Sequence, residues 1–258
     1  MSALAGRTAV VTGAGTGIGK AIAEDFAAAG ATVIVVGRRK TPLDETVSAI
    51  TKAGGNASAI ACDLTIADDI EALGAKILSE FGPVDILINN AGFSSKIRSA
   101  RYVGAEEWQA VMDVNTLGPA MLTRALLPSM IEQGRGDVVM ISSMAAIRPS
   151  VMAGAVYSAA KSAARAYMEV LYAEVRSHGI RCITVFPGEV DTPILDNRAL
   201  PPDAEKRALM MMPEDISAAV LMAVSLPARA TVTEIALGAT YPRDLSDDID
   251  AAMTKETT

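Results

Sequence analysis

Short apolar stretches rich in valine, isoleucine and alanine alternate along the chain with longer stretches of helical pattern. The apolar stretches predict strands at Thr8–Thr12, Thr32–Val36, Ala57–Ala61, Val84–Ile88, Asp137–Ile141, Arg181–Phe186 and Val232–Ala236. Helices are predicted at Gly17–Ala29, Thr41–Ala53, Ala67–Phe81, Glu106–Gln133, Tyr157–Ser177 and Glu214–Ser225. Strands that are apolar throughout and separated by helices predict an α/β fold with a parallel sheet buried on both faces.

The alternation is broken between Pro187 and Pro213, where five of the chain's twelve prolines lie. A connection of this length is uncommon unless it binds a ligand, so we expect a substrate lid around residues 188–213. No internal repeat, low-complexity linker or change of composition divides the rest. We therefore expect one domain over residues 1–258, with an acidic C-terminal tail from about residue 243 that is disordered or used at an interface.

Composition and charge narrow the function classes. Half of the 258 residues are hydrophobic, which is enough for a sizeable core, and the net charge is −7. An acidic chain is a poor partner for nucleic acid or an anionic membrane surface. No apolar run approaches the ~18 residues that span a bilayer. The N-terminal residues also lack a secretory signal, so we expect a cytoplasmic protein.

Histidine and cysteine are too few for the common metal sites. The chain has one histidine, His178, and two cysteines, Cys62 and Cys182, each in an apolar context. These features favour buried free thiols, and no metal site is expected. A Ser-His-Asp nucleophile is also disfavoured, because no Gly-x-Ser-x-Gly turn is present. Tyrosine, lysine and a bound cofactor are therefore better candidates for catalysis.

The first predicted strand leads into a glycine-rich turn, Thr12-Gly13-Ala14-Gly15-Thr16-Gly17-Ile18-Gly19, at which a helix begins. Glycines let the backbone approach a pyrophosphate, and the helix N-terminus offers free N–H groups and the positive end of its dipole. Glycine in such a turn also serves packing alone. Its place after the first strand favours a dinucleotide phosphate site.

The second predicted strand ends in Gly37-Arg38-Arg39-Lys40, without a carboxylate. A carboxylate here would bind the ribose hydroxyl of NAD, whereas Arg38 and Arg39 suit the additional phosphate of NADP. We therefore expect NADP, with NAD less favoured; the alternative is a solvated basic loop. The missing acid also argues against a methyltransferase, which uses one here to bind its cofactor.

Tyr157 and Lys161 lie four residues apart in an alanine-rich stretch that is predicted to be helical. This spacing puts both side chains on one helix face. An ammonium group beside a phenol favours the phenolate and lowers a pKa that starts near ~10. Such a tyrosine can exchange a proton with an alcohol or carbonyl near neutral pH. The alternative is a solvated helix face with one aromatic ring and one cation.

Taken together, the motifs resemble those of the short-chain dehydrogenase/reductase family along nearly the whole chain. They are Thr12-Gly13-x-x-x-Gly17-Ile18-Gly19, Cys62-Asp63-Leu64, Asn89-Asn90-Ala91-Gly92, Val114-Asn115, Ile141-Ser142-Ser143, Tyr157-x-x-x-Lys161 and Pro187-Gly188-x-Val190-x-Thr192. Each is weak alone, but their order and spacing are specific. The resemblance implies a single doubly wound Rossmann-type sheet of about seven strands with helices on both faces, forming one dinucleotide-binding and catalytic domain.

The resemblance implies roles for four catalytic residues. Tyr157 would be the acid/base, and Lys161 would contact the nicotinamide ribose and lower the tyrosine pKa. Ser143 would hold the substrate oxygen, while Asn115 would kink its helix and bind a water that relays protons to Lys161. Strand alternation points only one of Ser142 and Ser143 toward the cofactor. The family pattern favours Ser143, with Ser142 as its structural neighbour.

The resemblance also places the cofactor. Asp63 would contact the adenine and Asn89 the adenosine ribose region. Val190 and Thr192 would contact the nicotinamide carboxamide. The expected cofactor residues are Gly13, Thr16, Gly17, Ile18, Gly19, Arg38, Arg39, Asp63, Leu64, Asn89, Ala91, Gly92, Tyr157, Lys161, Pro187, Gly188, Val190 and Thr192.

Residues that follow the motifs are expected to line the substrate pocket. These are Phe93, Ser94, Ser95, Ala145, Arg148, Met152 and Glu189. Arg148 either clamps a substrate carboxylate or forms a surface ion pair. The segment 209–212 is either an adaptable apolar lid wall or ordinary packing at a helix end.

The sequence thus predicts an NADP(H)-dependent oxidoreductase that transfers a hydride between the nicotinamide and a carbonyl or secondary alcohol, with Tyr157 as acid/base. The alternative is a non-catalytic dinucleotide-binding sensor or scaffold of the same fold. Against it, all four expected catalytic residues are present. Small side chains cover more than one face of the alanine-rich helix, and only one face can meet the sheet. We therefore expect a homotetramer or homodimer.

Overall fold

The computed structural model describes residues 2–254 and is built around a sheet of seven strands. The strands are β1 (Thr8–Thr12), β2 (Thr32–Gly37), β3 (Asn56–Ala61), β4 (Ile86–Asn89), β5 (Gly136–Ile141), β6 (Ile180–Pro187) and β7 (Glu234–Leu237). They lie in the order β3-β2-β1-β4-β5-β6-β7, and every neighbouring pair is parallel. The strand order reverses between β1 and β4, so the predicted doubly wound α/β fold is confirmed.

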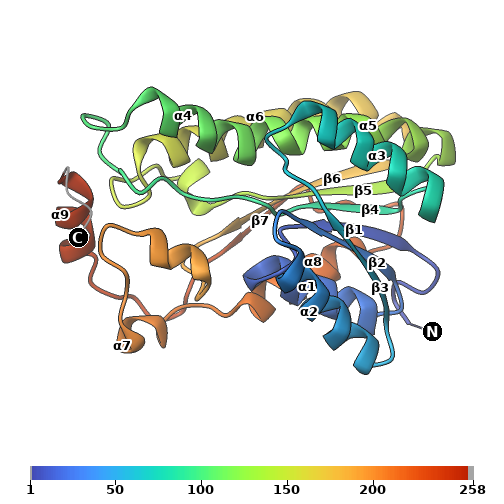
Figure 1. Cartoon of the computed structure of the whole chain (residues 1–258), viewed down its shortest axis with the longest axis horizontal. Coiled ribbons are helices and arrows are strands. Elements are labelled where there is room, and N and C mark those ends of the chain that lie inside the picture. The colour runs from blue at the N-terminus through green and yellow to red at the C-terminus, as the bar shows by residue number, and fades with distance from the viewer. Residues whose placement is uncertain (1, 255–258) are drawn as a thin grey trace.

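Helices cover both faces of the sheet (Figure 1). One layer holds α3 (Ala67–Phe81), α4 (Ala105–Met112), α5 (Gly118–Gln133) and α6 (Ala155–Val175), and the other holds α1 (Gly17–Ala28), α2 (Lys40–Lys52) and α8 (Pro213–Val224). Val10 of β1 packs into the core shared with α5 and α6, whereas Ala9 and Val11 pack into the core shared with α1 and α2. This two-sided burial explains why the strands are apolar at successive positions.

The long helix predicted over Glu106–Gln133 is interrupted in the structure. A π-helical turn, η1 (Asp113–Leu117), separates α4 from α5. Asn115 is buried in this turn, and its side-chain amide donates to the carbonyl oxygens of Val111 (2.8 Å) and Phe93 (2.9 Å). The π-helical turn therefore lies where the kink at Asn115 was expected, and Asn115 ties this helix to the loop after β4.

The proline-rich interval after β6 is irregular, as predicted, but it is anchored to the sheet. It contains a 3₁₀ turn, η4 (Pro193–Asn197), and a short helix, α7 (Ala204–Arg207). The N–H of Met211 donates to the carbonyl oxygen of Glu189 at 3.1 Å, and the Met211 side chain is buried in the core. Segment 209–212 was expected to be either a lid wall or ordinary packing, and Met211 agrees with ordinary packing.

The acidic tail is folded within the described residues. Helix α9 (Ser246–Met253) lies beyond the same end of the sheet as α7 (Figure 1). The Arg243 guanidinium donates to Asp248 of α9 at 2.9 Å and to Glu189 at 2.7 Å. The expectation of disorder is therefore wrong for residues 246–253, because largely buried ion pairs dock this helix. Within residues 2–254, no helix is both long and apolar enough to cross a bilayer.

Candidate active site

A cavity of about 480 Å³ opens at the carboxyl ends of the strands, where ligands bind in sheets of this type. Its walls come from the turn after β1, the loops after β4 and β5, the first turns of α6 and the segment after β6. Motifs that are far apart in the sequence therefore meet in one place.

The turn after β1 presents bare backbone at one end of the cavity. Gly13 and Gly17 have φ angles of +65° and +54°, which glycine adopts without strain. A Cβ at Gly19 would lie 2.4 Å from the Asn90 side chain and 2.5 Å from the Gly13 carbonyl oxygen. The Thr16 side chain does not cap α1, so the first N–H groups of the helix point outward for an anion. This geometry fits the pyrophosphate of a dinucleotide.

The basic residues after β2 are exposed beside this turn. Lys40 is paired with Asp44 at 2.6 Å, whereas Arg39 lines the cavity. Burial acts to raise the pKa of Asp63, but local hydrogen bonds and the charge of Arg38 hold it below its usual value. Arg38 therefore lies toward Asp63, and Arg39 lies toward the cavity.

Most of the predicted cofactor residues line the cavity: Gly13, Thr16, Gly17, Ile18, Arg39, Ala91, Gly92, Tyr157, Lys161, Pro187, Gly188, Val190 and Thr192. The others, Gly19, Arg38, Asp63, Leu64 and Asn89, lie outside its lining. The amide of Asn89 is buried and donates to the Thr123 hydroxyl at 2.9 Å. Asn90, which the sequence analysis did not single out, lines the cavity and donates to the Thr12 carbonyl oxygen at 2.9 Å.

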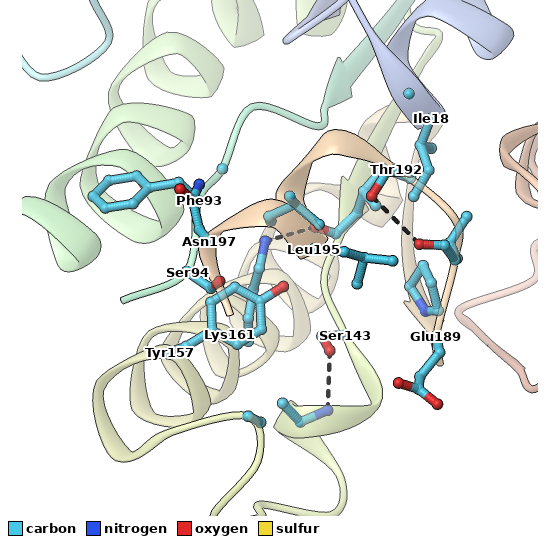
Figure 2. Close-up of a pocket in the computed structure, with 18 of the residues that line it drawn as sticks. Ile18, Phe93, Ser94, Ser143, Tyr157, Lys161, Glu189, Thr192, Leu195 and Asn197 are labelled. Atoms are coloured by element: carbon cyan, nitrogen blue, oxygen red, sulfur yellow. Dashed lines mark hydrogen bonds between the residues drawn. The ribbon is translucent and has the colours of Figure 1, made fainter. Parts of the chain in front are cut away.

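Tyr157, Lys161 and Ser143 face the same part of the cavity (Figure 2). The first two lie one turn apart on α6, and the Lys161 ammonium nitrogen is 5.6 Å from the centre of the Tyr157 ring. This nitrogen donates to the Ile141 carbonyl oxygen at 2.9 Å. Ser143 follows β5, and its hydroxyl oxygen accepts a hydrogen bond from the N–H of Ala145 at 3.1 Å.

The adjacent serines after β5 are oriented differently. The Ser142 hydroxyl is buried and donates to the carbonyl oxygen of Lys161 at 3.2 Å, which fastens α6 to the end of β5. The Ser143 hydroxyl is directed into the cavity (Figure 2). This placement matches the expected division between a structural serine and a site serine.

Burial dominates the electrostatics of the site. It raises the pKa of Tyr157 above its usual value. The Ser143 hydroxyl and the charges of Arg98 and Arg198 act in the opposite direction without cancelling that effect. Burial also lowers the pKa of Lys161 to about 8. The expected net lowering of the Tyr157 pKa is therefore wrong, because desolvation of the phenolate outweighs the nearby positive charges.

Asn115 and Lys161 border one small space beside Gly92. The Oδ1 atom of Asn115 is buried and has no hydrogen-bond partner within residues 2–254. A Cβ at Gly92 would lie 2.6 Å from this atom and 3.3 Å from the Lys161 ammonium nitrogen. A hydrogen-bond acceptor and a donor are thus brought together where only glycine leaves room.

The predicted pocket residues Phe93, Ser94, Ala145, Arg148, Met152 and Glu189 all line the cavity. The Phe93 ring packs against the small apolar cluster that contains Val111 and Val156, and Arg148 is exposed. Ser95 does not line the cavity; its hydroxyl is buried and donates to Glu107 at 2.6 Å.

Glu189 belongs to an ion-pair network at the outer wall of the cavity. Its carboxylate accepts hydrogen bonds from Arg198 and Arg243, each at 2.7 Å. Burial acts to raise the pKa of Glu189, but these two arginines hold it below its usual value. Glu189 is therefore ionised at neutral pH and links the segment after β6 to the C-terminal helix.

Two arginines of the cavity wall were missed by the sequence analysis. Arg98 follows β4, Arg198 follows η4, and both line the cavity. Neither lies in a motif. The sequence offered one sign that Arg98 lines the cavity, which is its position after a strand. Loops after the strands lie at the carboxyl edge of the sheet, where ligands bind.

Comparisons with known proteins agree with this geometry. Residues 7–202 match the family model described as short chain dehydrogenase. A short chain dehydrogenase of Pseudocercospora fijiensis is 39% identical over 193 residues, and the match covers 73% of this chain but only 61% of that protein's length. The short-chain reductase protein NovJ of Streptomyces niveus is 40% identical over 191 residues, covering 74% of this chain and 72% of that protein.

Solved structures give the same result. A metagenomic short-chain oxidoreductase in complex with NADP matches this chain with a TM-score of 0.80 at 33% identity. The match covers 92% of this chain and 98% of that one. The likeness therefore extends over nearly the whole fold.

Proposed function

This chain belongs to the short-chain dehydrogenase family, and we propose that it is an NADP(H)-dependent oxidoreductase that interconverts a carbonyl group and a secondary alcohol. The observation that carries the proposal is the meeting of Tyr157, Lys161 and Ser143 in one cavity with the glycine turn after β1. The turn suits a pyrophosphate, and the three side chains suit the holding and protonation of a substrate oxygen.

The choice of NADP rests on charge. β2 ends in Gly37 without a carboxylate, and Arg38 and Arg39 follow it beside the glycine turn. The related metagenomic oxidoreductase was solved with NADP. We assign the 2′-phosphate to these two arginines and the adenosine to the region of Asp63, Leu64 and Asn89.

The opposite end of the dinucleotide is assigned to the segment after β6. Pro187, Gly188, Val190 and Thr192 line the cavity and would hold the nicotinamide ring. When bound there, NADPH supplies a hydride. The neighbouring interval from residue 188 to 213 would act as the substrate lid.

The proton comes from the chain itself. Ser143 donates a hydrogen bond to the substrate carbonyl oxygen, and Tyr157 delivers a proton to that oxygen. The raised pKa of Tyr157 keeps its proton in place at neutral pH until negative charge develops on the oxygen. Lys161 and a water held by Asn115 beside Gly92 would return a proton to Tyr157.

The competing function is a dinucleotide sensor or scaffold without turnover. The convergence of the catalytic side chains disfavours it, because a sensor does not need them. A panel of aldehydes, diketones and 3-hydroxy acids, followed by NADPH absorbance, separates the two functions. Reduction of one carbonyl class with NADPH supports the enzyme. NADPH binding without any turnover across the panel would support the sensor.

We also propose a homodimer or homotetramer. Leu117 and Val170 are 51% and 67% exposed on the helix layer that carries α5 and α6, and the small residues Ala166 and Ala173 share the exposed side of α6 with Val170. Exposed apolar surface of this kind favours association across a two-fold axis. Light scattering tests it: a mass near that of one 26.8 kDa chain would contradict the proposal.

The two buried free cysteines support a reducing, cytoplasmic location.

A further inference from the structure

Arg98 is a buried cation in the wall of the substrate end of the cavity. Its side chain is 6% exposed and lines the cavity. One terminal nitrogen donates to the Ser94 hydroxyl, and the other donates to the Ala153 carbonyl oxygen, each at 2.8 Å. The charge of Arg98 acts on Tyr157, so the guanidinium lies on the side of the cavity where the proton is transferred.

No carboxylate within residues 2–254 lies within 4.0 Å of Arg98, and its acceptors are neutral oxygens. The Nε atom of Arg98 is buried and has no hydrogen-bond partner among the described residues. Glu107 acts on Arg98 only from a greater distance, and its carboxylate is bound by the N–H of Lys96 and the hydroxyl of Ser95. Burial lowers the pKa of Arg98 to about 10, so it is still charged at neutral pH.

The neighbouring arginines differ from Arg98 in this respect. Arg198 is paired with Glu189 at 2.7 Å, and Arg243 is paired with Asp248 at 2.9 Å as well as with Glu189. Their positive charges are therefore balanced by carboxylates of the chain. A buried charge without a counter-charge is unfavourable, so Arg98 is suited to an anion that arrives with the ligand.

We propose that Arg98, assisted by Ser94, binds a carboxylate of the substrate, so that the carbonyl compound is a short oxo acid. The inference rests on the proposed function. With the carboxylate on Arg98, the carbonyl group of a 2-oxo or 3-oxo acid points toward Tyr157 and Ser143. The carbonyl carbon gains a hydride and its oxygen gains a proton, NADPH is oxidised to NADP, and the carboxylate is unchanged. The product is the corresponding hydroxy acid.

The test compares acids with their uncharged esters. The substrates are 2-oxobutanoate, 3-oxobutanoate and the ethyl ester of each, assayed with wild type, Arg98→Gln and Arg98→Lys. Charge-assisted hydrogen bonds predict that Arg98→Gln lowers kcat/KM for the preferred acid by about 10- to 100-fold, mainly through KM, and changes that for its ester by less than about three-fold. Arg98→Lys restores part of the loss. Lys96→Gln removes an exposed charge from the same loop and should leave kcat/KM for both the acid and its ester unchanged.

A merely structural role for Arg98 gives a different result, because its bonds to Ala153 and Ser94 hold the loop for any substrate. An equal loss for acid and ester in Arg98→Gln, or a wild type that prefers the esters, would overturn the proposal. If Arg98→Gln does not fold, Arg98→Lys takes its place in the test. A ratio of kcat/KM for the acid to kcat/KM for the ester that is the same in Arg98→Lys as in wild type would count against the proposal.

Calorimetric titration with butanoate in the presence of NADP gives a readout that does not depend on turnover. Binding to wild type that is lost in Arg98→Gln supports the anion site even if no carbonyl is reduced, in which case only the proposed function fails. Reduction of neutral carbonyls without detectable butanoate binding, and without preference for the acids, leaves the proposed function standing and refutes the role of Arg98.

Discussion

The two ends of the cavity are built differently. Beside β1 the surface is backbone, with positive φ angles at Gly13 and Gly17 and no side-chain cap on α1. At the opposite end the surface is formed by side chains, among them the charged Arg98 and the pair Glu189–Arg198. A backbone site depends on side chains being absent, whereas a side-chain site depends on the balance of charge. The two ends should therefore fail through different kinds of substitution.

The largest effect on cofactor binding is expected where the backbone site is filled. In Gly19→Ala the new Cβ would lie 2.5 Å from the Gly13 carbonyl oxygen, which cannot move without distorting the turn. We expect a loss of about 2 kcal/mol in the free energy of unfolding and NADPH binding too weak to measure by fluorescence titration. Gly104→Ala is the control, since a Cβ there meets no atom within 4 Å. Near-normal NADPH affinity in Gly19→Ala would contradict the backbone model.

The next effect concerns charge at the backbone end. The double variant Arg38→Ala/Arg39→Ala should raise KM for NADPH by about 100-fold, because charge-assisted bonds to the 2′-phosphate are lost. KM for NADH should change little. The control Lys40→Ala removes a cation that Asp44 already neutralises at 2.6 Å, so it should leave both values nearly unchanged. Equal increases for NADPH and NADH, or a wild type that prefers NADH, would refute the assignment.

Breaking the ion-pair network at the side-chain end is expected to lower the free energy of unfolding. Arg243→Ala leaves Asp248 and Glu189 without their shared partner, and breaking a buried pair in this way destabilises by about 3 kcal/mol. Arg165→Ala is the control, because Arg165 and Glu234 form a pair whose side chains are 34% and 37% exposed, worth less than about 1 kcal/mol. Urea unfolding measures both, and equal losses would show that the network does not fasten α9.

The smallest effect is a pH dependence. The pKa of Lys161 is lowered by burial from 10.5 to about 8. Between these values the folded state has released the proton and the unfolded state still holds it, so the free-energy cost of burying Lys161 falls as pH rises through this window. The unfolding free energy of wild type relative to Lys161→Met should therefore rise between about pH 7 and pH 10. A constant or falling difference in urea titrations would contradict the burial of this ammonium.

The backbone end could be predicted from the sequence because its signal is local. The glycine turn, β1 and the start of α1 at Gly17 were placed correctly, since each depends on adjacent residues. The side-chain end could not be predicted in this way. Arg98, Arg198 and α9 come together through tertiary packing, and no motif marks them. Sequence alone also gave the wrong direction for the Tyr157 pKa, because burial is a property of the fold.

The proposed reaction takes place at Tyr157, where the cofactor end and the substrate end of the cavity meet. Tyr157 lies between them, on α6, and the proposed chemistry needs its hydroxyl but not its ring. Binding at either end should therefore survive removal of the hydroxyl, whereas turnover should not.

The most direct test of the central claim is Tyr157→Phe, assayed for NADPH binding by fluorescence and for carbonyl reduction by NADPH absorbance. The account predicts NADPH affinity close to that of wild type and a fall in kcat of about 10²- to 10⁴-fold, the usual contribution of a general acid. A Tyr157→Phe enzyme that retains a near-normal kcat would contradict the role of Tyr157 and, with it, the proposed mechanism.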